Sequence, residues 1–218
     1  MPSQDSFQFL VNTPVIPVLT IERVEDAVPL ARALVEGGLP VLEVTLRTQA
    51  ALKAIAAIAR EVPQAVVGVG TITRVEDIAR AGDAGARYLV SPGTPPELAD
   101  ALAQAFIPAI PGCATVSEAM ALAAHGFTLL KFFPADASGG LAWLRSAGAP
   151  LPDLRFCPTG GIDGRNAATY LALPNVVAVG GSWVAPKAAL AAGDFAAVTA
   201  LAREAAGLRS ADYKSASE

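Results

Sequence analysis

The feature that most constrains the fold is an alternation of two kinds of segment along the whole chain. Short runs rich in β-branched residues are each followed by turn residues and then by an alanine-rich stretch with helical periodicity. The pattern predicts eight strands, at residues 14–19, 40–46, 65–70, 87–90, 106–110, 128–133, 154–158 and 175–180. Helices are predicted between them, as in the amphipathic residues 48–62 and 115–126.

Strands that alternate with helices pair in parallel through right-handed crossovers. Eight such units in 218 residues predict an α/β protein folded as a compact (β/α)8 TIM barrel. An open doubly wound sheet is the alternative, but neither GVGTIT (68–73) nor TGGIDG (159–164) completes a dinucleotide fingerprint at the first strand–helix turn. No linker divides the chain, so we expect a single domain over residues 1–218, with a short N-terminal helix at residues 3–11 closing the barrel bottom.

Charge and hydropathy exclude several classes of partner. The net charge is −4 and the 16 lysines and arginines are scattered, so we expect no binding surface for nucleic acid or for anionic membranes. The N-terminal segment lacks the basic stretch of a secretory signal, and the longest uncharged run, residues 166–186, is split by Pro174 and Asn175. We therefore expect a cytoplasmic protein without a membrane span.

Metal sites and disulfides find no support in the sequence. Cys113 and Cys157 are far apart and form no CxxC motif, and His125 is the single histidine. We expect two small buried cysteines, a histidine at a helix end, no metal and no cofactor.

Lys131 is the first candidate for chemistry, because it lies in the apolar run TLLKFF between two leucines and two phenylalanines. In one interpretation its stem lies along apolar surface, with the ammonium group in water or in an ion pair. In the other it is a desolvated amine that acts as a nucleophile. The segment alone leaves both interpretations open.

Polar residues gather at the predicted carboxyl ends of the strands, where (β/α)8 barrels carry their chemistry. Glu43, Thr45 and Arg47 occupy alternate positions and should point to one face of their strand. In a dry barrel interior, Glu43 and Arg47 beside Lys131 must pair with one another or bind a ligand. Other predicted strand ends carry Gly70–Thr71, Ser91–Pro92–Gly93, Pro111–Gly112 and Phe133.

Two glycine doublets, Gly160–Gly161 and Gly180–Gly181, follow the last two predicted strands, and Ser182 comes next. They are either plain turn glycines or a site where backbone N–H groups approach a phosphate near a helix start. The last two strands are the usual phosphate corner of this barrel, which favours the second interpretation.

The motifs PVIPVL, LEVTLRT, GVGT, SPG, IPG, LKFFPA, FCPTGGI and GGSW stand in this order from about Pro14 onward. In order and spacing the chain resembles the 2-keto-3-deoxy-6-phosphogluconate (KDPG) aldolase family, and KFFPA together with CPTGGI is the most specific part. One departure is Cys113, where related sequences often have a hydroxyl or aliphatic residue.

The resemblance implies a homotrimeric class I aldolase that cleaves its phosphorylated keto acid, KDPG, to pyruvate and glyceraldehyde 3-phosphate in the Entner–Doudoroff pathway. It implies a Schiff base on Lys131, proton transfer by Glu43 through a bound water, and carboxylate binding by Arg47. The remaining implied contacts are a pyruvate pocket of Thr71, Pro92 and Phe133, a contact of Thr159 with the sugar hydroxyls, and phosphate binding by Gly160, Gly161, Gly181 and Ser182.

Three other interpretations stay open. A sister aldolase would use the same mechanism on the galactonate epimer or on 4-hydroxy-2-oxoglutarate. An isomerase or synthase would share the phosphate corner but needs paired carboxylates or a Cys/Asp pair, which the predicted strand ends lack. A non-catalytic phosphate-binding barrel would use Lys131 only as an ion-pair partner.

Overall fold

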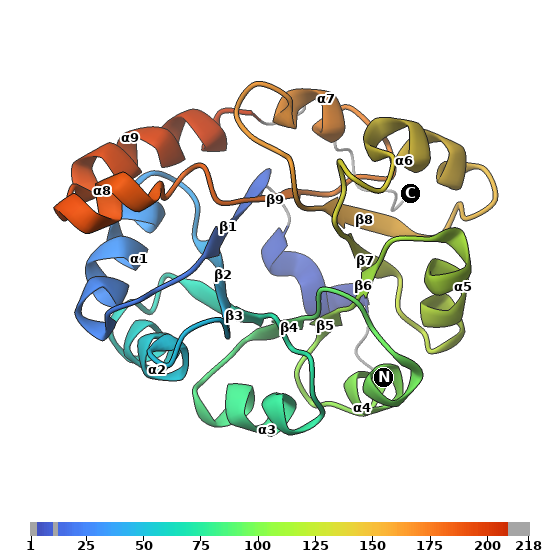
Figure 1. Ribbon diagram of the computed structural model, residues 1–218, viewed down its shortest axis with the longest axis horizontal. Coiled ribbons are helices and arrows are strands. Elements are labelled where there is room, and N and C mark those ends of the chain that lie inside the picture. Colours follow the sequence, from blue (N-terminus) through green and yellow to red (C-terminus); the bar gives the residue numbers. More distant parts are fainter. Residues whose placement is uncertain (1–3, 11–12, 209–218) are drawn as a thin grey trace.

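The computed structural model describes residues 4–10 and 13–208 (Figure 1). The strands within these ranges are β1 (Val15–Leu19), β2 (Val41–Thr45), β3 (Val66–Gly70), β4 (Tyr88–Val90), β5 (Ala109–Ile110), β6 (Gly112–Cys113), β7 (Leu129–Phe132), β8 (Arg155–Pro158) and β9 (Val179–Gly181). The α-helices are α1 (Ala27–Glu36), α2 (Ala51–Glu61), α3 (Glu76–Asp83), α4 (Pro96–Ala103), α5 (Val116–Ala124), α6 (Gly140–Gly148), α7 (Ala167–Leu171), α8 (Lys187–Ala192) and α9 (Phe195–Ala206). Two 3-10 helices are η1 (Gln4–Leu10) and η2 (Val24–Asp26).

All strand pairs of the described chain are parallel, and the sheet curls so that the helices surround it (Figure 1). The prediction of an α/β fold with a parallel sheet is thus confirmed. The continuous ladder holds six strands in the order β5-β4-β3-β2-β1-β9, and β6-β7-β8 form a second group. Two isolated bridges, Phe156 to Val176 and Thr159 to Gly180, connect the β8 segment with the β9 segment.

The fifth and eighth predicted strands differ from the prediction. The fifth was expected at residues 106–110, but β5 begins at Ala109 and the strand resumes as β6 after Pro111. Proline has no N–H group to donate to a ladder, which explains an interruption at this residue. The eighth was expected at residues 175–180, but β9 is confined to Val179–Gly181.

The N-terminal segment forms the 3-10 helix η1, which covers most of the predicted residues 3–11. Ser3 and Val11 lie outside the described residues. Leu10 is buried in a cluster with strand residues, and the Phe9 ring lies 5.1 Å from the Tyr88 ring. The helix therefore packs against side chains on the inner face of the sheet.

Successive residues of a strand point to opposite faces of the sheet, and the buried side chains form two clusters accordingly. Leu42, Val44, Leu130 and Phe132 belong to the larger cluster, which includes the buried faces of the helices. The inner cluster consists of Leu10, Ile16, Val41, Tyr88, Val90, Ile110, Leu129, Cys157 and Ala178. Further along the same strands, the inner face carries polar residues, which is where the predicted site lies.

Both cysteines are free and buried, as the sequence predicts. Burial raises the pKa of each thiol to about 12. His125 ends α5, where Nδ1 lies 2.8 Å from the Ala121 carbonyl oxygen and Nε2 lies 3.1 Å from Asp100 Oδ1. In the described part of the chain, every helix is too short or too polar to cross a bilayer.

Candidate active site

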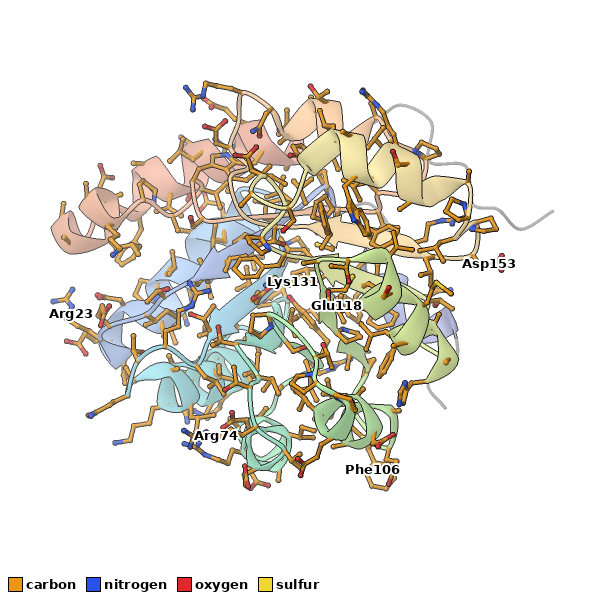
Figure 2. All side chains as sticks on the ribbon, turned by 45° about the vertical axis from the view of Figure 1, so that its right-hand side comes forward. Arg23, Arg74, Phe106, Glu118, Lys131 and Asp153 are labelled. Atoms are coloured by element: carbon orange, nitrogen blue, oxygen red, sulfur yellow. The ribbon has the colours of Figure 1, made fainter. Side chains whose placement is uncertain are left out.

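Lys131 of β7 and Glu43 of β2 meet inside the curled sheet, although they are 88 residues apart in sequence. Lys131 Nζ donates to Glu43 Oε1 at 2.8 Å and to Oε2 at 3.2 Å. Each side chain is only 5% exposed, and Figure 2 shows Lys131 in the middle of the molecule. A buried pair of this kind resists separation, since removing one partner leaves an uncompensated charge at a cost of about 3–5 kcal/mol.

Glycines of the neighbouring strand β3 make room for this arrangement. Glu43 is the ladder partner of Gly68, and Thr45 is the partner of Gly70. A methyl group at Gly70 would overlap the Glu43 carboxyl group, and one at Gly68 would overlap the Tyr88 ring. From the sequence, Gly70 is only a predicted strand end, because a glycine's neighbour across a sheet is not visible there.

Tyr88 lies against Gly68, the ladder partner of Glu43, and is completely buried. Its hydroxyl group donates to the Leu42 carbonyl oxygen at 2.8 Å. Burial raises the pKa of Tyr88 well above its usual value, and the negative charge of Glu43 adds to this effect. Tyr88 is therefore a neutral, hydrogen-bonded side chain near Glu43.

Arg47 does not join Glu43 and Lys131 in the interior, contrary to the expectation that residues 43, 45 and 47 share one strand face. The strand β2 ends at Thr45, the chain turns, and Arg47 is exposed. Thr45 stays buried and its Oγ1 donates to the Leu19 carbonyl oxygen at 2.9 Å. Among the described residues, Arg47 has no ion pair with Glu43, so its guanidinium group faces solvent near the carboxyl end of β2.

The three residues of the predicted pyruvate pocket lie at strand ends and are half-buried. The Phe133 ring centroid lies 5.5 Å from Lys131 Nζ. Thr71 follows β3 directly and has a φ of 64°, a left-handed conformation that is unfavourable for a β-branched residue. Pro92 follows Ser91 at the end of β4.

Ser91 is a buried polar residue whose contacts the sequence did not reveal. Its Oγ accepts the Gly112 N–H at 3.0 Å and lies 2.8 Å from Thr94 Oγ1, which donates to the Gly112 carbonyl oxygen at 3.0 Å. Gly112 is the ladder partner of Lys131. These hydroxyl groups thus connect β4 with β6 beside Lys131, next to the interruption at Pro111.

The predicted phosphate residues lie together around the Thr159–Gly180 bridge. Gly160 and Gly161 have φ values of 100° and 76°, which only glycine adopts without strain. Thr159 is 6% exposed, and a methyl group at Gly180 would overlap its Oγ1. Gly181 is buried, whereas Ser182 and Gly161 are exposed.

Neither glycine doublet lies at a helix start. The helix α7 begins at Ala167 and α8 begins at Lys187, both after intervening loops. The helix-dipole part of the phosphate prediction is therefore wrong for these segments, and any phosphate binding there depends on loop N–H groups and the Ser182 hydroxyl group.

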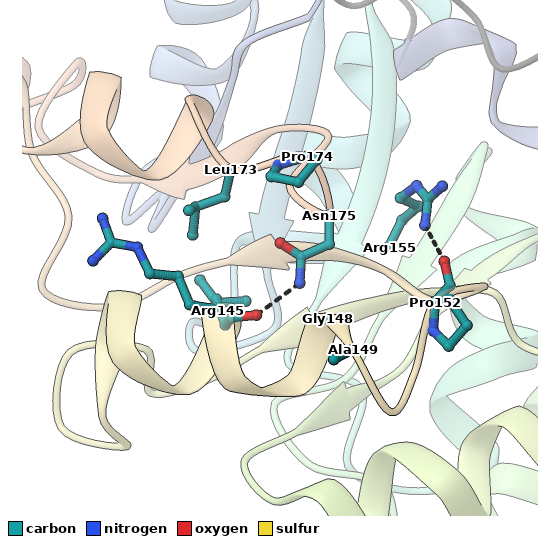
Figure 3. A pocket seen from close by; sticks show the side chains of 9 residues that line it. Arg145, Gly148, Ala149, Pro152, Arg155, Leu173, Pro174 and Asn175 are labelled. Atoms are coloured by element: carbon teal, nitrogen blue, oxygen red, sulfur yellow. Dashed lines mark hydrogen bonds between the residues drawn. The ribbon is translucent and has the colours of Figure 1, made fainter.

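A cavity of about 400 Å³ lies elsewhere, between the end of α6 and the start of β8 (Figure 3). Asn175 Nδ2 donates to the Leu144 carbonyl oxygen and Arg155 Nη1 donates to the Pro152 carbonyl oxygen, both at 2.8 Å. The Asn175 and Arg155 side chains thus bind neighbouring backbone, and the lining of the cavity includes no predicted site residue. The lining consists of Leu144, Arg145, Gly148, Ala149, Pro152, Arg155, Leu173, Pro174 and Asn175.

Residues 8–201 match the family described as KDPG and KHG aldolase. Over 203 residues, covering 93% of both chains, the sequence is 51% identical to a 2-dehydro-3-deoxy-phosphogluconate aldolase of Pseudoalteromonas atlantica. It is 50% identical to the KHG/KDPG aldolase of Escherichia coli K12, over 90% of this chain and 92% of that one.

Among solved structures, a KDPG aldolase of Legionella pneumophila superposes with a TM-score of 0.89 at 42% identity, covering 94% of this chain and 98% of that chain. That structure holds pyruvate, captured at low pH as a covalent carbinolamine intermediate. The chain described here belongs to the KDPG and KHG aldolase family.

Proposed function

We propose that this protein is a class I aldolase that cleaves KDPG to pyruvate and glyceraldehyde 3-phosphate in the Entner–Doudoroff pathway. The observation that carries the proposal is the buried contact of 2.8 Å between Lys131 Nζ and Glu43 Oε1. A buried amine beside a carboxylate supplies a nucleophile and a proton acceptor in one place. The chain's membership of an aldolase family, and the carbinolamine in its Legionella relative, support the same chemistry.

The reaction begins when Glu43 accepts a proton from the Lys131 ammonium group. The neutral amine attacks the C2 ketone of the substrate, and the resulting carbinolamine loses water as Glu43 returns the proton to the departing oxygen. This leaves an iminium ion and an ionised Glu43. The positive iminium is the electron sink for the step that follows.

Cleavage follows when Glu43 takes the proton of the C4 hydroxyl group. The electron pair of the C3–C4 bond moves into the iminium, so glyceraldehyde 3-phosphate leaves and an enamine remains. Glu43 then protonates C3 of the enamine, and water hydrolyses the new iminium to release pyruvate. Lys131 and Glu43 return to their starting ion pair, and no metal or cofactor takes part in these steps.

The other predicted residues bind parts of the substrate in this proposal. The exposed guanidinium of Arg47 pairs with the carboxylate, and Thr71, Pro92 and Phe133 surround the pyruvate portion. Thr159 contacts a mid-chain hydroxyl group. The phosphate is bound at the loop positions Gly160, Gly161, Gly181 and Ser182.

We further propose that the curled sheet is one closed (β/α)8 barrel in a single domain. Only Pro111 separates β5 from β6, and two bridges join the β8 and β9 segments, which supports closure. A homotrimer and a cytoplasmic location complete the proposal. The fully exposed Phe106 (Figure 2) is a candidate for the subunit contact, and so is the exposed Met120 of α5.

Turnover and trapping together test this function. The wild type should release one pyruvate per KDPG, with a higher kcat/KM than for the galactonate epimer or for 4-hydroxy-2-oxoglutarate. Incubation with pyruvate and borohydride should label Lys131, among the lysines 53, 131, 187 and 214. Label on another lysine, or no label, would contradict the proposed nucleophile.

The second candidate is a sister aldolase whose preferred substrate is 4-hydroxy-2-oxoglutarate. It is favoured by the family description, which includes KHG, and by the dual name of the Escherichia coli relative. Both substrates give pyruvate through the same Schiff base, so the ratio of their kcat/KM values distinguishes the two candidates.

A further inference from the structure

The loop that follows Gly160 and Gly161 is held by the side-chain amide of Asn166. Its Nδ2 donates to the Gly161 carbonyl oxygen at 2.9 Å, and its Oδ1 accepts the Asp163 N–H at 2.9 Å. The side-chain amide of Asn166 thus binds the loop backbone at two points, Gly161 and Asp163. Asp163 in turn accepts the Arg165 N–H at 2.9 Å, so the loop contains a connected set of polar contacts.

Three consecutive carbonyl oxygens of this segment each accept a hydrogen bond from the protein. Thr159 O accepts the Ala135 N–H at 2.8 Å, and Gly160 O accepts the Asp136 N–H at 3.0 Å. Gly161 O accepts the amide of Asn166. Carbonyl oxygens repel an anion, so a loop that binds phosphate must keep them occupied and turned away from the ligand.

Of the three donors, Asn166 is the one side chain; the other two are backbone groups. The bond to Gly161 O fixes the peptide that joins Gly161 to Ile162. Because a peptide is planar, the direction of the Ile162 N–H depends on this bond. A substitution at Asn166 therefore releases the loop without touching Lys131 or Glu43.

We infer that Asn166 is a positioning residue that sets the aldolase's preference for phosphorylated aldehydes over unphosphorylated ones. It acts through the peptide that joins Gly161 to Ile162, whose N–H belongs to this loop, and is not a catalytic residue. The inference rests on the proposed function, because it assumes that the substrate phosphate lies at this loop. It predicts that the phosphate preference and the Schiff-base chemistry are separable by one substitution.

The experiment uses the reverse reaction, in which pyruvate adds to an aldehyde. D-glyceraldehyde 3-phosphate and D-glyceraldehyde differ only in the phosphate, so the ratio of their kcat/KM values measures its contribution. In Asn166→Ala, this ratio should fall about tenfold or more, through a higher KM for the phosphorylated aldehyde. The kcat/KM for glyceraldehyde and the borohydride trapping of pyruvate should not change.

Three further variants separate positioning from other effects. Asn166→Asp keeps an oxygen for the Asp163 N–H but has no donor for Gly161 O, so its ratio should fall as in Asn166→Ala. Arg165→Ala removes the charge of a side chain that is 92% exposed and leaves both hydrogen bonds of the Asn166 side chain in place. This variant should therefore keep most of the kcat/KM ratio between the phosphorylated and the unphosphorylated aldehyde. Thr169→Ala, on the exposed side of α7, should behave like the wild type.

Each contrary outcome has a distinct meaning. An unchanged ratio in Asn166→Ala, or an equal loss for both aldehydes, would overturn the positioning role while the aldolase function stands. An Arg165→Ala variant that loses as much of the ratio as Asn166→Ala would also overturn it, in favour of simple charge attraction. A wild type that forms no product with either aldehyde would instead overturn the proposed function.

Discussion

Gly70 of β3 lies directly against the carboxyl group of Glu43 of β2, where a methyl group would overlap the carboxyl oxygen and the two carbons next to it. The contact is possible because β2 and β3 are ladder partners and Gly70 has no side chain. The placement of the Glu43 carboxyl group beside Lys131 therefore depends on Gly70, a residue that has no functional group of its own.

Gly70→Ala should displace the Glu43 carboxylate and lower kcat at least tenfold, while overpacking costs about 1–3 kcal/mol of the free energy of unfolding. Urea unfolding and pyruvate release measure the two effects. Gly93→Ala is the matched control, because a methyl group at Gly93 meets no atom within 4 Å. A Gly70→Ala enzyme with wild-type kcat would show that the exact position of Glu43 is unimportant.

Glu43→Gln should lower kcat for KDPG cleavage by about 10²–10⁴-fold, the usual range for loss of a general acid–base group. The amide oxygen still accepts a hydrogen bond from Lys131, so the variant should fold. Steady-state kinetics are compared with Glu97→Gln, an exposed position on α4. Equal turnover in the two variants would remove Glu43 from the mechanism.

Thr159→Val should reduce the preference for the gluconate over the galactonate epimer about tenfold or more in the ratio of kcat/KM, since an unpaired buried hydroxyl costs about 1–3 kcal/mol. Thr159 is buried, and its hydrogen bond to the Cys157 carbonyl oxygen is long, at 3.4 Å, so the hydroxyl group can bind a ligand. Pyruvate should still be trapped on Lys131. An unchanged ratio would leave Thr159 a purely structural role beside Gly180.

Light scattering at micromolar concentration should give three times the 22.2 kDa mass of the chain. A mean hydropathy of +0.45 is high, and association buries apolar surface such as the exposed Phe106 side chain. Phe106→Ser should weaken the trimer, whereas Thr128→Ser, a conservative change at another exposed position, should not. A wild-type mass of 22.2 kDa by light scattering would contradict the proposed trimer.

Much of the fold follows from local pattern. Strand β7 and its flanking helices are visible in the sequence because burial on both faces selects a continuous apolar run, and amphipathic helices repeat at their own period. Lys131 is also visible in the local pattern, since a lysine in an apolar run conflicts with its surroundings unless it has a partner or a function. The motifs around Lys131 and Thr159 also indicated the family that the comparisons established.

Only the tertiary structure decided which side chains meet. The sequence placed Glu43 and Arg47 on one strand face, but β2 ends between them, so that one is buried against Lys131 and the other is exposed. The folded backbone likewise sets three further contacts, of Gly70 with the Glu43 carboxyl group, of Ser91 with Gly112, and of Asn166 with Gly161. The physical reason is that periodicity and burial are properties of one segment. The distance of 2.8 Å between Lys131 Nζ and Glu43 Oε1, which are 88 residues apart in sequence, depends instead on strand register and sheet curvature.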